Sequence, residues 1–576
     1  MFDSRSHARP RHILGLLITL FTVSIADIAF AKVMTDDRVE VSAEPSHMLD
    51  LSLVNRVPLA SYEQLCDGGE QALCFSEPLK QIYSDNDFMP LWRSPELREA
   101  LLLRIKTLAY AEIVSGMDER LVELQQLEQQ QDLRGFDLLA TDTYLVYQAL
   151  MQQITARPSM LFRHQTLRPI KVSQWETKPD TVISSVVTSG LNELLLRDSL
   201  GVNSNELIVI ARALRQAELL RQLPAHQYQL VGRKVVRRGQ DIPNGQQLLE
   251  VLYNYGDLPP EAYNPLTLDP VVNNDGEVNN AIKRFQRRNG LDDDGIIGPA
   301  TARQLALPYQ EVSRVIALNM HRSQFGASGA KRPTIRVNIP DYQLQITHKN
   351  NVVFESKVIV GRSTRPTNLF SSALSVMVVN PKWNIPETIK KEDVIPGIQA
   401  SPDYLERKNL KIIHSWRDRS EILPETIEWS TVDPETFPYE FMQGPGPTNA
   451  LGNVKFLMPN DYSIYLHDTP ARSLFRRTKR NLSSGCVRVE KAAELAEFIL
   501  KYQRYSSVGS YDNLVAVEDT DTINISRKID VDFTYVTAWV DENNTLQMRE
   551  DIYGYDRAIE EPVEDIFSTM KNYRRY

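Results

Sequence analysis

The sequence has little that would suit a membrane-spanning or nucleic-acid-binding protein. Beyond the amino terminus, no segment approaches 18 consecutive apolar residues, which excludes a polytopic membrane protein. Basic residues (65) are outnumbered by acidic ones (74), and a net charge of -9 provides no general basic field for nucleic acid. Hydrophobic residues still make up 42% of the 576, and the length predicts about three to five domains.

Motifs for metals and nucleotides are missing as well. The chain contains no H-E-x-x-H or C-x-x-C pattern, no G-x-x-x-x-G-K-[ST] loop and no G-x-G-x-x-G fingerprint. We therefore predict no metal site and no cofactor.

Cysteine is scarce, with three residues in the chain. Cys66 and Cys74 are near enough to close a short loop, which favours a disulfide in an oxidising compartment; two reduced thiols are the alternative. Cys486 has no partner in sequence. It is either a small buried apolar residue or a reactive thiol, and its neighbours must decide.

The amino terminus predicts export. Three arginines lie within the first 12 residues, an apolar stretch covers 13–25, and Ala29-Phe30-Ala31 forms an A-x-A cleavage site. Residues 1–31 are therefore predicted to be a signal peptide that is cleaved after Ala31. An uncleaved anchor helix is the alternative.

Residues 32–226 are predicted to form a helical scaffold. Apolar residues recur at three- and four-residue spacing over 96–113 and 118–131. Ser204 is a predicted N-cap for a further helix over 207–223. No cluster of histidine, cysteine or paired carboxylates in this region indicates a function.

A second helical unit is predicted over 227–308. Ile282 and Phe285 lie on one helical face, Gly290 ends that helix, and Thr301 to Leu305 begins another. The stretch resembles the three-helix peptidoglycan-binding module of many cell-wall enzymes. The same apolar pattern is needed merely to pack the helices, so sugar binding stays open. A helical linker is expected over 309–331.

The pattern changes to strand alternation from residue 332. A β-rich domain is predicted over 332–520, with an irregular, proline-rich insertion over 384–450 as a lid or binding loop. Residues 521–576 are predicted to be an extension that flanks the sheet. The fold class is therefore α+β multidomain. The predicted strands cover 334–339, 342–346, 352–360, 374–379, 455–458 and 464–466.

Candidate chemistry lies just beyond the insertion. His467 ends a predicted strand, and Cys486 follows 19 positions later, directly after Gly485, which permits a tight turn. A predicted helix over 491–502 comes next. A cysteine at a strand-to-helix junction, with a histidine on a neighbouring strand, is the arrangement that a thiolate and imidazole pair needs.

Five motifs together resemble the large murein L,D-transpeptidases of the YcbB type, which combine a YkuD-like catalytic domain with a peptidoglycan-binding domain. The wider family often has His-Gly-Cys, whereas this chain has Ser484-Gly485-Cys486; large members commonly carry serine there. The motifs are V-G-R at 360–362, N-P-K-W-N-I-P at 380–386, G-P-G-P-T-N-A-L-G-N-V-K-F at 444–456, H-D-T-P at 467–470 and S-S-G-C-V-R-V at 483–489.

The resemblance implies that Cys486 is the acylated nucleophile and His467 the general base and acid. A free thiol is only partly ionised near neutral pH, so an adjacent imidazole must make or stabilise the thiolate. The N–H groups around Gly485 and Cys486, with the hydroxyl of Tyr465, are candidates for the oxyanion hole. We expect Ser484 to orient the imidazole through its carbonyl.

Other residues are candidates for substrate binding. Arg488 holds either a substrate carboxylate or a structural ion pair. The resemblance places Trp383 at the mouth of the site, and Asn449 is a further candidate. A basic loop, defined as residues 472–480, carries five basic residues. It is either a solvated surface loop or a region that attracts carboxylate-rich stem peptides and favours the thiolate.

The reaction implied by the resemblance needs no cofactor. Cys486 attacks the bond between diaminopimelate and the terminal D-alanine of a tetrapeptide donor, D-alanine leaves, and an acceptor's diaminopimelate amine takes the acyl group to give a 3-3 crosslink. Expected partners are donor and acceptor stem peptides, carbapenems as covalent inhibitors and glycan-synthesising enzymes, in the periplasm and without nucleic acid. Hydrolysis, attachment of a protein to the wall, and a non-catalytic wall-binding scaffold are the alternatives.

Overall fold

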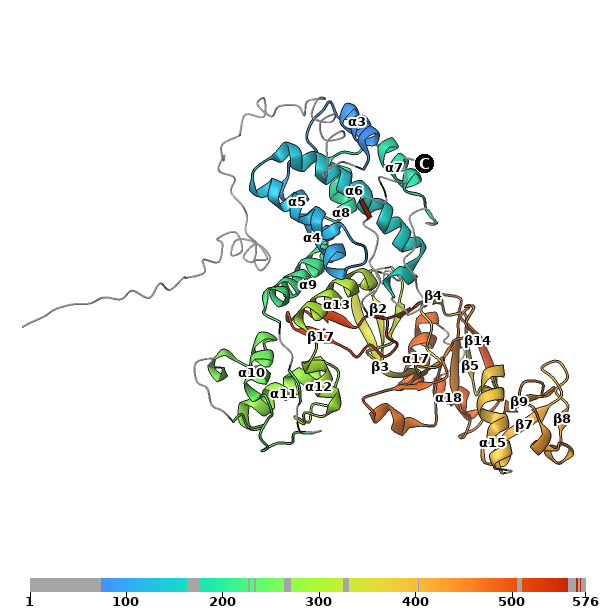
Figure 1. The fold of residues 1–576 in the computed structure, drawn as a ribbon. Coiled ribbons are helices and arrows are strands. Elements are labelled where there is room, and N and C mark those ends of the chain that lie inside the picture. Colours follow the sequence, from blue (N-terminus) through green and yellow to red (C-terminus); the bar gives the residue numbers. More distant parts are fainter. Residues whose placement is uncertain are drawn as a thin grey trace, which may run out of the picture. The chain divides into compact units, whose positions relative to one another are not determined.

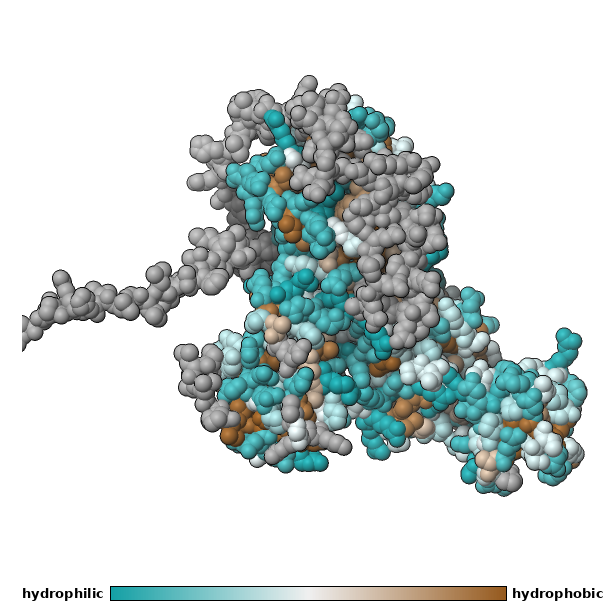
Figure 2. Space-filling model, viewed as in Figure 1, coloured by the Kyte–Doolittle hydropathy of each residue, from teal (hydrophilic) through white to brown (hydrophobic). Residues whose placement is uncertain are grey.

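The computed structural model (Figure 1) describes residues 74–162, 176–225, 228–230, 232, 235–263, 271–324, 331–401, 403–504, 510–557, 566, 567 and 570. The predicted signal peptide and Cys66, and with it the predicted disulfide to Cys74, lie outside these residues. None of the helices within them is long and apolar enough to cross a membrane. On the face seen in Figure 2, hydrophilic residues predominate over the described surface.

Helices α3 to α8 form an amino-terminal region packed around one buried core, and α9 packs with α13 (Tyr309–Ser323) in a second core. The side chain of Ser204 accepts a hydrogen bond from the N–H of Leu207, as an N-cap does, and Ser94 caps α4 in the same way. The three helices predicted here are confirmed within two residues at each end. The helices are α3 (Ser76–Asp85), α4 (Pro95–Ala111), α5 (Met117–Gln129), α6 (Leu133–Ala156), α7 (Pro179–Thr188), α8 (Glu193–Leu200) and α9 (Asn205–Gln222).

The next unit is a small bundle with its own core. Ile282 and Phe285 are buried in it, and Gly290, at a φ of +64°, follows the end of α11 as predicted. Its helices are α10 (Gly245–Asn254), α11 (Gly276–Arg288) and α12 (Pro299–Leu305), and α13 (Tyr309–Ser323) then leads toward the sheet.

A curled 11-stranded sheet follows in the order β14-β5-β10-β11-β13-β3-β2-β1-β15-β4, with β12 paired to β3. The predicted strands are confirmed in type and approximate position, and α17 (Ala492–Gln503) and α18 (Tyr511–Ala516) contribute to the same core. The strands are β1 (Thr334–Asn338), β2 (Gln343–His348), β3 (Asn351–Gly361), β4 (Phe370–Ala373), β5 (Val376–Val379), β10 (Val454–Leu457), β11 (Leu466–His467), β12 (Asn481–Ser483), β13 (Val487–Val489), β14 (Asp521–Asn524) and β15 (Asp530–Thr534).

The end of the chain differs from the expectation. β14 pairs with β5, and β15 pairs with β1 and β4, so part of the predicted flanking extension lies within the sheet itself. Alternation marks a strand, but it does not say which distant strand will accept its hydrogen bonds. The hairpin of β16 (Ala538–Val540) and β17 (Leu546–Met548) instead packs with α9 and α13.

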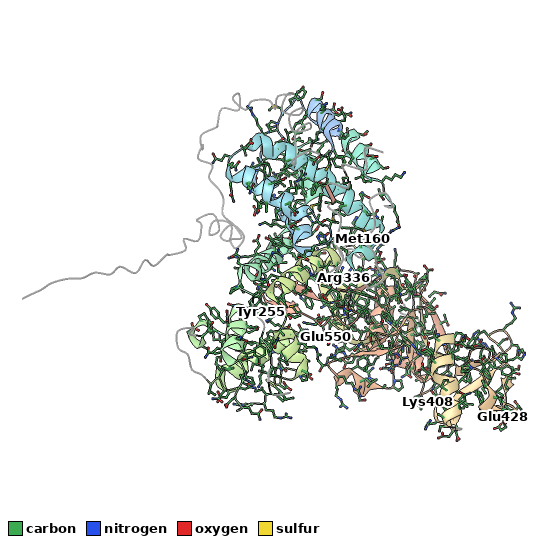
Figure 3. All side chains as sticks on the ribbon, viewed as in Figure 1. Met160, Tyr255, Arg336, Lys408, Glu428 and Glu550 are labelled. Atoms are coloured by element: carbon green, nitrogen blue, oxygen red, sulfur yellow. The ribbon has the colours of Figure 1, made fainter. Side chains whose placement is uncertain are left out.

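The insertion predicted to be irregular is folded. It contains a four-stranded sheet in the order β6-β9-β7-β8 and a separate core that includes Ile395 and Phe441. Lys408 and Glu428, both in this insertion, are labelled in Figure 3. Its elements are β6 (Trp383–Asn384), α14 (Glu387–Ile389), a π-helical turn (Lys390–Val394), α15 (Ile395–Ala400), α16 (Tyr404–Arg407), β7 (Leu410–Ile413), β8 (Glu421–Ile422) and β9 (Glu440–Gln443).

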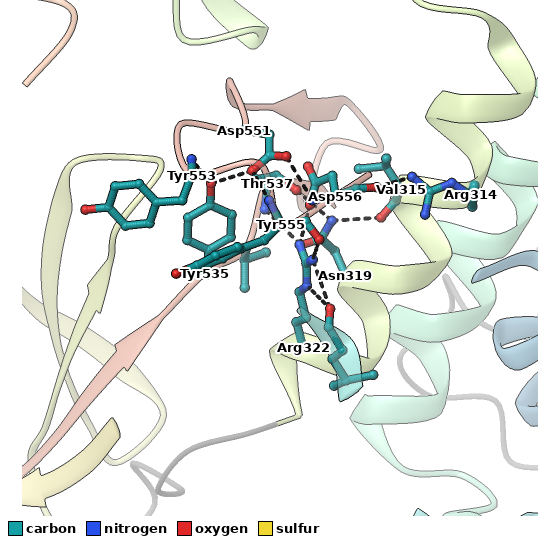
Figure 4. A network of polar contacts seen from close by, with 12 residues as sticks. Arg314, Val315, Asn319, Arg322, Tyr535, Thr537, Asp551, Tyr553, Tyr555 and Asp556 are labelled. Atoms are coloured by element: carbon teal, nitrogen blue, oxygen red, sulfur yellow. Dashed lines mark hydrogen bonds and ion pairs between the residues drawn. The ribbon is translucent and has the colours of Figure 1, made fainter. Parts of the chain in front are cut away.

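A buried polar network joins α13 to the end of the chain (Figure 4). Arg322 pairs with Asp556 at 2.5 Å, and Asn319 donates a hydrogen bond to the hydroxyl of Thr537 at 2.9 Å. Buried charges and amides are stable only when partnered in this way. The network therefore holds the carboxy-terminal segment against α13.

Candidate active site

Strand register brings the two candidate catalytic residues together. β11 and β13 are parallel neighbours in which His467 pairs with Arg488. The N–H of Val487 donates to the carbonyl of Tyr465 at 3.1 Å, so Cys486 lies across from Tyr465. Strand spacing of about 4.8 Å and a rise of about 3.3 Å per residue then put the Cα atoms of Cys486 and His467 about 8 Å apart.

Burial shows which face of the sheet carries the site. Leu466 and Val487, the other members of this register, are fully buried in the core of the sheet. Because side chains alternate along a strand, His467 and Cys486 lie on the opposite face. The sequence prediction that they meet at one place agrees with this arrangement.

Hydrogen bonds from neighbouring segments support the turn before Cys486. Gly485 has a φ of +115°, and its carbonyl accepts a hydrogen bond from the hydroxyl of Thr367 at 2.7 Å. The N–H of Gly361 donates to that same hydroxyl, and the hydroxyl of Tyr553 donates to the carbonyl of Gly361 at 2.7 Å. The conformation of the turn therefore depends on a residue near the end of the chain.

The thiol of Cys486 is neutral in this resting site. Burial raises its pKa, although hydrogen bonds from the hydroxyl and N–H of Tyr465, and the charge of Arg488, act in the opposite direction. The sulfur also donates weakly to the carbonyl of Ser463, 3.8 Å away. Tyr465, which was expected to serve the oxyanion hole, is directed at the sulfur here and accepts a hydrogen bond from the side chain of Trp383.

The imidazole of His467 is neutral too. It is 4% exposed, and burial together with the charges of Arg488 and Lys455 lowers its pKa to about 3. Because both groups are neutral at rest, the imidazole makes the thiolate by taking its proton, which is one of the two roles expected of it.

The residue that orients the imidazole differs from the prediction. Nδ1 of His467 lies 2.6 Å from the carbonyl oxygen of Asp468 and must donate to it. Ser484, which was expected to do this through its carbonyl, is exposed, and its hydroxyl accepts a hydrogen bond from Arg365 at 3.1 Å. The adjacent residue reaches Nδ1 because the backbone turns directly after β11.

The candidate oxyanion hole is smaller than expected. The N–H of Gly485 donates to the hydroxyl of Ser483 at 3.2 Å, which leaves the N–H of Cys486 as the unused donor of the pair among the described residues. Removing one such donor typically costs about 3 to 4 kcal/mol of transition-state stabilisation.

Asn449 is a buried structural residue that a substrate could not reach. It is 1% exposed, and its amide nitrogen donates to the carbonyls of Pro381 at 3.0 Å and Gly444 at 2.7 Å. These two residues lie at the two ends of the insertion. Asn449 thus fixes the base of the insertion.

Arg488 has no acidic partner among the residues that the structure describes, and its buried Nε atom has no acceptor. Burial lowers its pKa. The alternative in which Arg488 forms a structural ion pair therefore finds no support. Its place beside Cys486 fits the other alternative, a site for a carboxylate.

Much of the basic loop is engaged in structural contacts. Arg472 pairs with Asp468 at 3.2 Å, and Lys479 pairs at 2.6 Å with Glu550, which is labelled in Figure 3. Arg480 is buried and donates to main-chain carbonyls. The loop thus braces the fold, and these contacts favour the alternative of a surface loop over that of a region that attracts stem peptides.

Arg365 links the insertion to the turn before Cys486. Its guanidinium forms an ion pair with Asp393 at 2.7 Å and another with Glu392, and it donates to Ser484. Sequence reasoning missed Arg365, Thr367 and Tyr553. They stand outside the motif residues to which chemistry could be assigned, and only the folded chain brings them to the site.

Three protein-family models match separate parts of this chain. Residues 332–521 match the YkuD family, described as an L,D-transpeptidase catalytic domain. The chain carries a YkuD-family L,D-transpeptidase domain. Residues 238–305 match a family described as "Putative peptidoglycan binding domain", and residues 77–198 match one described as a scaffold domain. The predicted resemblance and the α+β multidomain fold class are thereby confirmed.

Individual proteins were also compared with the chain. A Haemophilus influenzae protein named "Putative L,D-transpeptidase" is 42% identical over 225 residues, and the match covers 39% of this chain and 45% of that protein. The chain thus spans less than half the length of this relative. The crystal structure of an L,D-transpeptidase from Stackebrandtia nassauensis is 15% identical with a TM-score of 0.20, over 52% of this chain and 94% of that one. A TM-score this low carries no argument.

Proposed function

We propose that the whole chain is a periplasmic murein L,D-transpeptidase that forms 3-3 crosslinks through an acylated cysteine. The observation that carries this proposal is the placement of Cys486 and His467 on one face of adjacent strands, both in their neutral forms. A neutral imidazole can accept a proton, and a partly exposed thiol can reach a substrate. The match of residues 238–305 to a peptidoglycan-binding family supports the wall as substrate.

In the acylation step, Cys486 Sγ attacks the carbonyl carbon of the bond between diaminopimelate and D-alanine. His467 Nε2 takes the thiol proton as the carbon–sulfur bond forms, and the N–H of Cys486 faces the developing oxyanion. The carbon–nitrogen bond then breaks, and the imidazolium gives its proton to the leaving amine. D-Alanine departs, and a thioester to Cys486 remains.

In the second step, the side-chain amine of an acceptor's diaminopimelate attacks the thioester. His467 takes a proton from the amine and returns it to the departing sulfur. The products are an amide crosslink and the free thiol. Exclusion of water favours the amine over hydrolysis, which gives the folded insertion a purpose as a lid.

Purified protein with disaccharide tetrapeptides tests the proposal. We expect a crosslinked dimer and free D-alanine by liquid chromatography and mass spectrometry, and neither product with Cys486→Ala. Hydrolysed tripeptide without dimer would favour the hydrolase alternative. If neither appears with the native protein, a non-catalytic wall-binding scaffold becomes the better account.

Acylation by a carbapenem is a second, independent expectation of the same proposal. The drug's mass should be added to the peptide that contains Cys486, and Cys486→Ala should remain unmodified. The other peptides of the same digest provide an internal comparison. A label on another residue with none on Cys486 would contradict the assigned nucleophile.

A further inference from the structure

Three neighbouring strands carry a row of polar side chains across the candidate site. Lys455 on β10 pairs in register with His467 on β11, and His467 pairs in register with Arg488 on β13. Residues that pair in this way point to the same face of a sheet. Two cations therefore flank the imidazole, one on each side.

Lys455 resembles Arg488 in lacking a counter-ion. It is half-buried, forms no ion pair or hydrogen bond within the described part of the chain, and has its Nζ atom 6.0 Å from the ring centroid of Tyr465. Burial lowers its pKa. Lysine and arginine are seldom withdrawn from water without a partner, because the desolvation cost is high.

The two charges also repel a proton on His467. That arrangement keeps the imidazole unprotonated, although it also makes the imidazole a weaker base. Two unpaired cations on either side of one ring additionally present two sets of N–H donors to an anion. Charge-assisted hydrogen bonds to a carboxylate would satisfy both of them.

We propose that Lys455 and Arg488 together bind the carboxylate of the D-amino acid that leaves the donor peptide. This inference rests on the proposed function. His467 has to protonate the leaving nitrogen, and in an α-amino acid one carbon separates that nitrogen from the carboxyl carbon. When the nitrogen lies at the imidazole, the carboxylate must lie beside it, where the two cations are.

The donor's other nearby carboxylate, at the far end of the diaminopimelate side chain, is several carbons from the scissile carbonyl. It has no need to lie near His467. The site therefore selects donors whose chain ends one residue after the scissile bond, because only these present a carboxylate there. A buried polar site discriminates strongly against a substrate that lacks the matching group, because the site's own polar groups are then left unpaired.

Two tetrapeptide donors test this reading with the full chain, one ending in D-alanine and one in D-alaninamide. The native protein should process the acid with a kcat/KM about 10- to 100-fold above that of the amide, as expected for a charge-assisted hydrogen bond. Lys455→Met should lose most of this preference by slowing only with the acid. Lys455→Arg should keep it, and Lys382→Met, at an exposed position nearby, should behave as the native protein.

The contrary outcomes are distinct. If Lys455→Met slows the reactions of the acid and the amide donors equally, Lys455 acts through His467 or the fold. The inference is then wrong, while the proposed function stands. A third donor, amidated on the diaminopimelate side-chain carboxylate, tests whether Lys455 binds that carboxylate instead. If Lys455→Met loses the preference for this carboxylate and keeps the preference for the terminal one, the inference is also wrong. If the native protein releases nothing from any donor, the proposed function fails and this inference with it. A cooperative thermal melt checks that each variant is folded.

Discussion

His467 donates its Nδ1 hydrogen to the carbonyl of Asp468, 2.6 Å away. A carbonyl oxygen can only accept, so the contact fixes the tautomer in which Nε2 carries the lone pair. Because the partner is main chain, no side-chain substitution removes it. The path of the backbone after β11 thus determines which nitrogen of His467 can act as the base.

Replacing His467 should slow acylation without removing the thiol. General-base catalysis contributes about 10²- to 10⁴-fold, and we expect a loss in that range for His467→Ala. The measurement is the rate of D-alanine release under single-turnover conditions. A loss under about 3-fold, well below the range for general bases, would assign the proton to another group.

The pH dependence should be unusual for a histidine. With a folded pKa of about 3 against an ordinary value of 6.5, the imidazole stays neutral in the native protein where a free one would be charged. The acid limb of kcat/KM should therefore lie well below pH 6.5. Arg488→Met removes one repelling charge and should move the acid limb to higher pH, whereas Arg476→Met should leave it in place.

The same pKa shift makes stability depend on pH. Between the folded and unfolded pKa values the unfolded chain binds more protons, so the free energy of unfolding rises with pH there and falls on acidification. Thermal melts between about pH 4 and pH 7 should show a shallower dependence for His467→Asn than for the native protein. Equal slopes would contradict the lowered pKa.

The hydrogen bonds of Thr367 and Tyr553 that support the turn before Cys486 should affect the acylation rate more than the stability of the fold. Tyr553→Phe and Thr367→Val each remove hydrogen bonds worth about 0.5 to 1.5 kcal/mol to stability. Loosening the carbonyl of Gly485 should also lower the acylation rate several-fold. Tyr462→Phe, at an exposed tyrosine, is the matched control. Unchanged acylation in both variants would show that the turn holds itself.

Gly485 should tolerate no side chain. A Cβ there would meet nothing nearer than 3.6 Å, so the difficulty is the φ of +115° and not a clash. Such a backbone conformation costs about 1 to 3 kcal/mol in other residues. Gly485→Ala should therefore lose activity, while Gly444→Ala, with open space and no positive φ, should keep it. The two rates of D-alanine release make the comparison.

The contact between Arg365 and the insertion gives a test of the lid. Arg365→Met removes its ion pairs with Glu392 and Asp393, and we expect more hydrolysed tripeptide relative to crosslinked dimer. Arg407→Met, in the same insertion but away from the turn, serves as control. An unchanged product ratio would mean that the insertion excludes water by other contacts.

Local patterns predicted much of this molecule from its sequence. Alternation identified β1 to β3, Ser204 identified the start of α9, and the Gly485-Cys486 motif with His467 identified the candidate site. These signals are local, because capping, turns and side-chain alternation act within a few residues.

The long-range relationships were not predictable from such signals. The pairing of β15 with β1 joins segments almost 200 residues apart, and the contact of Tyr553 with Gly361 spans 192 positions. Asn449 shows the converse error: it belongs to a recognised motif but is buried as a structural residue. The charge states of Cys486 and His467 were not predictable either, since the burial of both residues depends on the whole fold.

The most direct test of the central claim is peptide mass spectrometry of protein quenched during turnover with a disaccharide tetrapeptide. The account predicts a thioester-linked disaccharide tripeptide on the peptide that contains Cys486, together with one equivalent of D-alanine, and neither with Cys486→Ala. An adduct on another residue, or D-alanine release that persists in Cys486→Ala, would contradict it.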